Sequence, residues 1–393
     1  MSYRLSSLGE LSMKILLLVS YLVFFSSFSH SKTVERPYID LSLVKLKAES
    51  EMPIQVDIKG VLKLVDGETR RAESLSANDD GTKLVWLAGK KKGKVPSGRS
   101  FGNWRSFKDH NGKWSSASHI VRQSFNFAYS ISIGAGDKEL ITIGSTNGFK
   151  KKIKIVDQNS REIYRLDRGD FEITEGSPYL KHGQISPDGK WLTFYTGDIP
   201  EIRGVMVYNF ETKRTYRLQA IDDKHPTWSS DGSKILVHFQ KGGNSSIQLD
   251  LPLEHAYIAY YDLEIDGNEL VSWSRTSLDD TDTDVFNYQK HPALTNDGKY
   301  LFYHSKKNPN ASSQLHVRKL EKGSTQYHLK IFTADGRELK KVKHVAMAKK
   351  VNELFIVGKV SKNKEGKDEK RFDHIYNISA KDLEKVLSNI FDK

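Results

Sequence analysis

The stretch GQISPDGKWLTFYT, residues 183–196, sets the pattern for most of this 393-residue chain. It consists of a short apolar segment, an Asp-Gly pair and a second segment rich in aromatic residues. Asp-Gly favours a tight hairpin because glycine reaches positive φ without steric cost. The pattern recurs, closely or in degenerate form, in SLSANDDGTKLVWLA (74–88), SISIGAGDKELITIG (130–144), PTWSSDGSKILVHF (226–239), PALTNDGKYLFYH (292–304) and VAMAKKVNELFIVG (345–358).

A second, weaker hairpin pattern lies between these copies, as in VMVYNFETKRTYRL (205–218) and YHLKIFTADGRELKKV (327–342). Two hairpins per repeat make four strands, which is the blade of a β-propeller. The sequence therefore predicts an all-β, six-bladed β-propeller. Seven blades is the alternative, if the long interval between Gly232 and Gly298 holds a further blade.

Both ends of the chain contribute to the predicted ring. The last repeat lacks a strand, and an unpaired hairpin pattern stands at residues 54–72. Propellers close by pairing N-terminal strands into the last blade, which removes open sheet edges. We therefore predict a closing hairpin over 54–72, paired with the blade built from 345–378. A short amphipathic helix is predicted over 380–391, packed on the propeller or binding a partner.

The N-terminal segment MKILLLVSYLVFFSSFSHS, residues 13–31, has one lysine, an apolar run and small polar residues. This pattern predicts a signal peptide over 1–31, cleaved after Ser31. Residues 32–393 then form one propeller domain without a stable membrane anchor; an uncleaved anchor is the alternative. The chain has no cysteine, which excludes disulfides and a lipidated-cysteine anchor. We expect a periplasmic or secreted protein.

The net charge of +12 suits an anionic partner, although solvated surface charge also accounts for it. The basic residues are spread along the chain, and export argues against nucleic acid as the ligand. The expected partner is a protein or an anionic polysaccharide. An acidic stretch, SLDDTDTDVF (277–286), resembles half of a calcium loop but lacks its glycine and closing glutamate, so we expect a solvated loop there.

Aligning the repeats reveals a candidate site. Four consecutive copies carry histidine seven residues before the aligned turn position, and each histidine follows a lysine: His182, His225, His291 and His344, with Lys181, Lys224, Lys290 and Lys343. Innermost strands line a propeller's channel, so the sequence predicts these residues as a ligand-binding ring near one mouth. Histidine also binds divalent metal and serves as an acid or base. The alternative is a Lys-His pair copied by duplication without a role.

Two segments that contain Asp-Gly turns carry a family resemblance: HPTWSSDG (225–232) and ISPDG (185–189). They resemble the repeat of TolB-type propellers, which implies the fold and a periplasmic scaffold for protein partners. We expect the partner to bind at the histidine-bearing mouth. The arrangement is also similar to some uronate-degrading lyases, which hold a divalent metal with channel histidines. A metal-assisted polysaccharide lyase using the four histidines is therefore the alternative function. No cofactor is certain, and the sequence leaves enzyme status open.

Overall fold

The residues that the computed structural model describes all belong to one compact unit, Leu46–Lys393. The described ranges are 56–66, 72–89, 101–120, 128–134, 139–145, 152–171, 179–197, 203–219, 222–240, 256–279, 287–308, 310–333, 337–360 and 374–392. The predicted signal peptide and its cleavage point after Ser31 lie outside these ranges. No described helix is long and apolar enough to cross a membrane.

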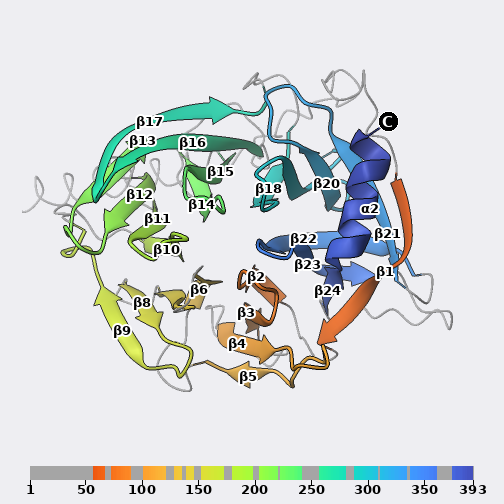
Figure 1. The fold of residues 1–393 in the computed structure, drawn as a ribbon, viewed down its shortest axis with the longest axis horizontal. Coiled ribbons are helices and arrows are strands. Elements are labelled where there is room, and N and C mark those ends of the chain that lie inside the picture. The colour runs from red at the N-terminus through yellow and green to blue at the C-terminus, as the bar shows by residue number, and fades with distance from the viewer. Residues whose placement is uncertain are drawn as a thin grey trace, which may run out of the picture. The chain divides into compact units, whose positions relative to one another are not determined.

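Six four-stranded blades form a ring, which confirms the predicted six-bladed β-propeller (Figure 1). Blades 1 to 3 contain, from the centre outward, β2 (Ala72–Ala77), β3 (Lys83–Gly89), β4 (Phe101–Phe107) and β5 (Ser118–His119); β6 (Ala128–Ile133), β7 (Ile141–Ser145), β8 (Lys152–Val156) and β9 (Glu162–Leu166); and β10 (Tyr179–Ile185), β11 (Trp191–Gly197), β12 (Gly204–Asn209) and β13 (Thr215–Gln219).

Blades 4 to 6 follow the same order. They contain β14 (Asp223–Trp228), β15 (Lys234–Gln240), β16 (Ala256–Asp266) and β17 (Glu269–Ser277); β18 (Gln289–Leu294), β19 (Tyr300–Ser305), β20 (Gln314–Lys319) and β21 (Tyr327–Thr333); and β22 (Leu339–Ala348), β23 (Glu353–Val360), β24 (His374–Ile378) and β1 (Val56–Asp66).

The Asp-Gly turns repeat one hydrogen-bond arrangement. In blade 3 the Ser186 hydroxyl donates to Asp188 at 2.5 Å and accepts from the Trp191 N–H at 2.9 Å. The glycine that follows the aspartate has φ between 69° and 75° in four blades, at Gly81, Gly189, Gly232 and Gly298. Positive φ favours glycine at this position, so this dipeptide identifies the turns in the sequence.

The hydrophobic core lies between neighbouring blades. Each of six buried clusters combines strands of two adjacent blades; one joins Trp191 and Val205 of blade 3 to Trp228 and Tyr261 of blade 4. All seven residues of β11 are buried, because a middle strand has a blade on each side. Fully burying one large apolar side chain contributes about 1.5–3 kcal/mol, so six such clusters hold the ring without disulfides.

The ring is closed by β1, though not by a hairpin. The second half of β1 pairs antiparallel with β24, with Lys63 opposite Asn377, as the predicted closure of the last blade requires. The first half pairs parallel with β21 of blade 5, with Val56 opposite Leu329. Within the predicted hairpin range 54–72, the described residues instead form this single strand and the start of β2. Alternation alone does not distinguish one long strand from two short ones.

Helix α2 (Ala380–Phe391) is confirmed at its predicted bounds. The Ser379 hydroxyl accepts from the Asp382 N–H at 3.3 Å and caps the first turn. Leu383 and Val386 are buried in the core cluster of blades 5 and 6, beside which Figure 1 draws the helix. The helix therefore packs on the propeller.

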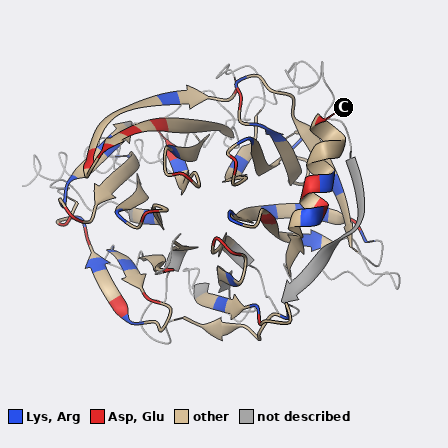
Figure 2. Ribbon diagram, viewed as in Figure 1, with Lys and Arg blue, Asp and Glu red and all other residues tan. Residues whose placement is uncertain are grey.

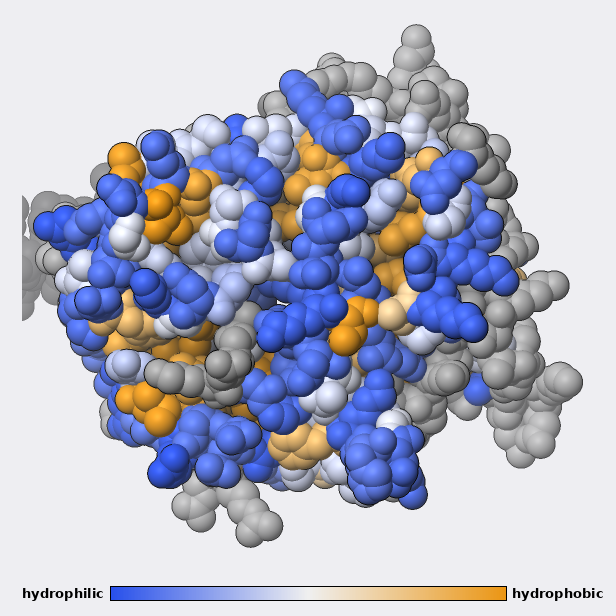
Figure 3. Space-filling model, viewed as in Figure 1, coloured by the Kyte–Doolittle hydropathy of each residue, from blue (hydrophilic) through white to orange (hydrophobic). Residues whose placement is uncertain are grey.

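Basic and acidic side chains alternate around the ring, so no blade of the described chain carries the positive charge alone (Figure 2). Hydrophilic residues cover the centre of the face in Figure 3, and apolar patches are scattered among them.

Candidate channel site

A β-bulge places one residue of each innermost strand at the channel. The register with the second strand shifts at this residue in blades 1, 3, 4 and 5, and one residue before it in blades 2 and 6, where Ser130 and His344 are themselves paired. His182, His225 and His291 have φ of 55°, 51° and 52° there. Positive φ is rare for residues other than glycine and commonly marks functional positions.

The four predicted histidines, here called the channel histidines, come together. The ring centroids of His182 and His225 lie 3.6 Å apart, those of His225 and His291 4.4 Å, and those of His291 and His344 4.2 Å. All four line one cavity of about 90 Å³. One water needs about 10–15 Å³ measured this way, so the cavity has room for several waters or a small ionic group.

The predicted lysines lie beside this cavity rather than in its wall. None of Lys181, Lys224, Lys290 and Lys343 is among the lining residues. The Lys290 ammonium lies 4.4 Å from the ring centroid of Tyr288, and the Lys224 ammonium lies 6.0 Å from that of Tyr195. The charges of Lys181 and Lys224 nevertheless act on His182, and that of Lys290 acts on His291.

A different lysine lines the cavity. Lys349, at the end of the inner strand of blade 6, donates from Nζ to the Trp228 carbonyl of blade 4 at 2.6 Å. Burial lowers its pKa to about 8, partly offset by the carboxylates of Asp79 and Asp231. Sequence reasoning missed Lys349 because the degenerate turn of this blade gave no reason to single it out.

Two further histidines stand behind the channel histidines. His238 and His304 lie on the second strands of blades 4 and 5 and are buried. His238 Nε2 is 3.1 Å from His225 Nδ1, and His304 Nε2 is 2.8 Å from His291 Nδ1. Each follows its channel partner by 13 residues, a repeated spacing that could have revealed both pairs in the sequence.

Burial keeps these imidazoles uncharged. The pKa of every channel histidine is lowered, first by desolvation. Positive neighbours add to this: Lys181 and Lys224 lower the pKa of His182, and Lys290 lowers the pKa of His291. The pKa of His344 falls to about 4. The site therefore combines neutral imidazoles with a surrounding positive potential.

A metal centre receives no support from this geometry. Among the described residues, no group of three or more His, Cys, Asp or Glu is arranged to hold a metal ion. The channel imidazoles contact one another as rings, whereas zinc ligands converge on a shared point at about 2.0–2.1 Å from each nitrogen.

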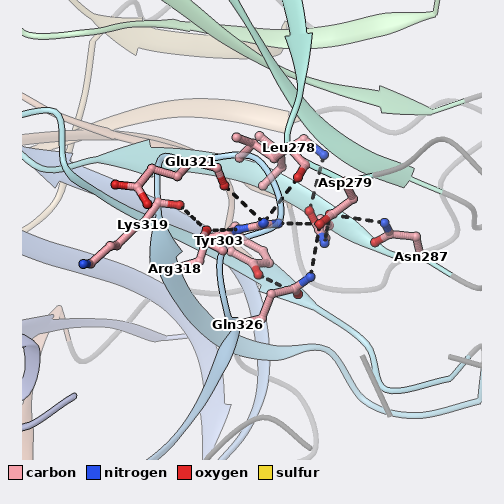
Figure 4. Close-up of polar contacts among 11 residues, drawn as sticks. Leu278, Asp279, Asn287, Tyr303, Arg318, Lys319, Glu321 and Gln326 are labelled. Atoms are coloured by element: carbon pink, nitrogen blue, oxygen red, sulfur yellow. Dashed lines mark hydrogen bonds and ion pairs between the residues drawn. The ribbon is translucent and has the colours of Figure 1, made fainter. Parts of the chain in front are cut away.

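The described part of the acidic stretch is also not a solvated loop. Asp279 accepts from Arg318 Nη1 at 2.7 Å and from Gln289 Nε2 at 2.6 Å (Figure 4). Arg318 is fully buried and also donates to the Leu278 carbonyl at 3.3 Å. Asp279 therefore links blades 4 and 5, which corrects the sequence-based expectation for this residue. Residues 280–286 lie outside the described ranges.

Comparisons with known proteins find distant structural likenesses only. No protein-family model and no curated protein matches the chain in sequence. A putative TolB from Agrobacterium tumefaciens is 15% identical with a TM-score of 0.45, over 66% of this chain and 80% of that chain. Regucalcin, a calcium-binding protein of the same organism, is 11% identical with a TM-score of 0.48, over 83% and 95%.

A putative 6-phosphogluconolactonase from Bacteroides uniformis is 12% identical with a TM-score of 0.42, over 79% of this chain and 86% of that chain. Proteins of such different function share only the architecture at this distance. The chain is a six-bladed β-propeller that resembles TolB distantly, and these likenesses carry no argument about its ligand.

Proposed function

We propose that this chain is an exported binding propeller that holds an anionic group of a partner molecule at the channel histidines. Export rests on the segment at residues 13–31, and the partner is a protein or an anionic glycan. The observation that carries the proposal is the positive potential around a small cavity lined by uncharged imidazoles. An anion gains from both the potential and the imidazole N–H donors.

Three carboxylates near the site face positive groups of their own, and one of them, the cavity-lining Asp79, acts on the Lys349 ammonium. Asp222 is bonded to Arg203 at 3.0 Å, and Asp223 is bonded to Arg275 at 2.8 Å. Inside the channel, Nδ1 of His344 is buried without a hydrogen-bond partner among the described residues. A buried polar atom of this kind is normally satisfied by a ligand or water. A lyase function is not proposed, because no observation favours a metal at these histidines.

A panel of anionic oligosaccharides and acidic peptides, bearing carboxylate, sulfate or phosphate groups, tests this function. We expect at least one member to bind the wild-type protein measurably by calorimetry. The double variant His225→Gln/His291→Gln should bind it at least tenfold more weakly. Glutamine is preferred to alanine because its amide can still bond the buried His238 and His304.

His110→Gln is the matched control, because His110 is exposed and distant in sequence from every channel position. It should bind as the wild type does. Failure of every panel member to bind, or equal binding by the double variant, would refute the proposed function. Circular dichroism of each variant checks that the fold is retained.

A further inference from the structure

The turn of blade 6 that carries Lys349 is fixed against two other blades. The Lys350 N–H donates to the Asp79 carbonyl of blade 1 at 2.9 Å. The side-chain oxygen of Asn352 accepts from the Asn296 N–H of blade 5 at 2.8 Å. These contacts hold the backbone of the turn, so the ring itself places Lys349 at the cavity.

The ammonium of Lys349 has more donors than acceptors around it. An ammonium carries three N–H donors, and one of them is used on the Trp228 carbonyl of blade 4. Among the residues that the structure describes, Lys349 forms no ion pair and no other hydrogen bond. Two donors are therefore left at the cavity wall. Donors left over on a partly buried cation favour a ligand or water as their partner.

The charged groups around Lys349 do not use these donors. They are Asp79 and Asp80 of blade 1, Asp231 of blade 4, Asp297 of blade 5 and Lys350 of its own turn. Attraction to Asp79 and Asp231 offsets part of the effect of burial, and the pKa of Lys349 still falls to about 8. Asp79 also lines the cavity and opposes part of the attraction for an anion. The contact with an anion therefore requires the free N–H donors of Lys349 as well as its charge.

Building on the proposed function, we infer that Lys349 makes the charged contact to the anion in the channel, and that this contact makes anion binding depend on pH. The protonated side chain donates to the anion through the N–H groups that the Trp228 carbonyl leaves free. No other lysine or arginine is among the described residues that line the cavity. The neutral amine, which forms as the pH rises, has lost both the charge and one donor.

The channel histidines do not share this pH dependence. Their pKa values lie below 6.5, so their imidazoles stay neutral at every pH above 7. Burial also lowers the pKa of Lys224, but this residue is not part of the cavity wall. Replacing Lys349 alone therefore separates its effect from that of Lys224.

Calorimetry with sulfate between pH 7 and pH 9.5 tests the contact, because sulfate stays fully ionised over this range. The wild type should bind sulfate at least tenfold more weakly at pH 9.5, where only about 3% of the Lys349 side chains remain protonated. Lys349→Arg keeps its charge throughout, so its affinity should not change with pH. Lys350→Arg, on the exposed neighbour, is the matched control and should follow the wild type.

The same decline in Lys349→Arg as in the wild type would overturn the inference, and so would equal wild-type affinities at the two pH values. If sulfate binds independently of pH but not to His225→Gln/His291→Gln, the proposed function stands and the inference falls. If neither sulfate nor any member of the wider panel binds, both fall. Circular dichroism checks the fold of each variant.

A measurement on the wild type does not depend on how a variant folds. Carbon-13 NMR of labelled lysine side chains, with Lys349→Arg used only for assignment, follows the titration of Lys349. Its midpoint should lie near pH 8 without ligand. Saturating sulfate should raise that midpoint by at least one pH unit, because a bound anion favours the charged form. A midpoint that sulfate leaves unchanged would show that Lys349 does not contact the anion.

Discussion

Burial of the channel histidines makes them resist protonation, and this couples the stability of the protein to pH. Each has a pKa below that of a histidine in the unfolded chain, which is about 6.5. Below that value the unfolded state binds more protons than the native state. Stability is therefore fully present above about pH 6.5 and is lost as the pH falls towards the native-state values.

We expect the urea midpoint to be lower at pH 5.5 than at pH 7.5. A histidine whose pKa falls to about 4, such as His344, lowers the free energy of unfolding by about 1 kcal/mol as the pH falls from 6.5 to 5.5. The variant His344→Gln should therefore lose less stability on acidification than the wild type, whereas His110→Gln should lose the same. Urea unfolding at the two pH values measures this. Midpoints independent of pH would contradict it.

The sequence predicted the four channel histidines because repetition placed them at one position. It could not predict that Lys181, Lys224, Lys290 and Lys343 act beside the cavity, because the bulge that separates neighbouring side chains is a property of strand pairing. The contact of His291 Nδ1 with the Lys343 carbonyl of the next blade, at 3.1 Å, was also not predictable from the sequence.

At the scale of elements, helix α2 shows how local pattern and tertiary packing combine. Its capping serine and apolar face are visible in the sequence, and both are used as predicted. What the face packs against was not predictable, because the partners belong to β strands far away in the chain. Phe391 contacts Tyr300 and Tyr327, with ring centroids 4.8 and 5.1 Å apart.

Leu383→Ala tests this packing. Leu383 is fully buried, so its truncation should lower the free energy of unfolding by about 2–5 kcal/mol. Ser388→Ala on the exposed side of the same helix should change it by less than about 0.5 kcal/mol. Denaturant unfolding of both variants gives the comparison. Similar stability for the two would mean that α2 is not part of the core.

At the scale of the whole propeller, the sequence predicted the blade number and the place of closure, because turns and alternating strands are local signals. It did not predict that β1 pairs with two blades. The pairing of β1 with both β21 and β24 requires blades 5 and 6 to lie side by side, and their relative position is set only in the folded ring. The central prediction of closure nevertheless stands, since β1 pairs with β24.

Removing residues 1–66 should prevent stable folding, because it exposes the edges of β24 and β21 together. The matched control is removal of residues 1–50, which keeps β1. The shorter deletion should give a monomer that unfolds cooperatively, and the longer one an aggregating or partly folded chain. Size-exclusion chromatography and thermal unfolding report the difference. A cooperative monomer without β1 would show that the ring does not need this strand.

The pairing of β1 with β24 also sets the order of folding events. These strands stand at opposite ends of the described chain, so the ring cannot close before the last blade has been synthesised. Contacts so distant in sequence carry a large loop-closure entropy and slow the folding of β proteins. Until then, β1 lacks its β24 partner and exposes an unpaired edge to other chains. The closing strand therefore makes ring completion a late event, and one in which the nascent protein is most exposed to aggregation.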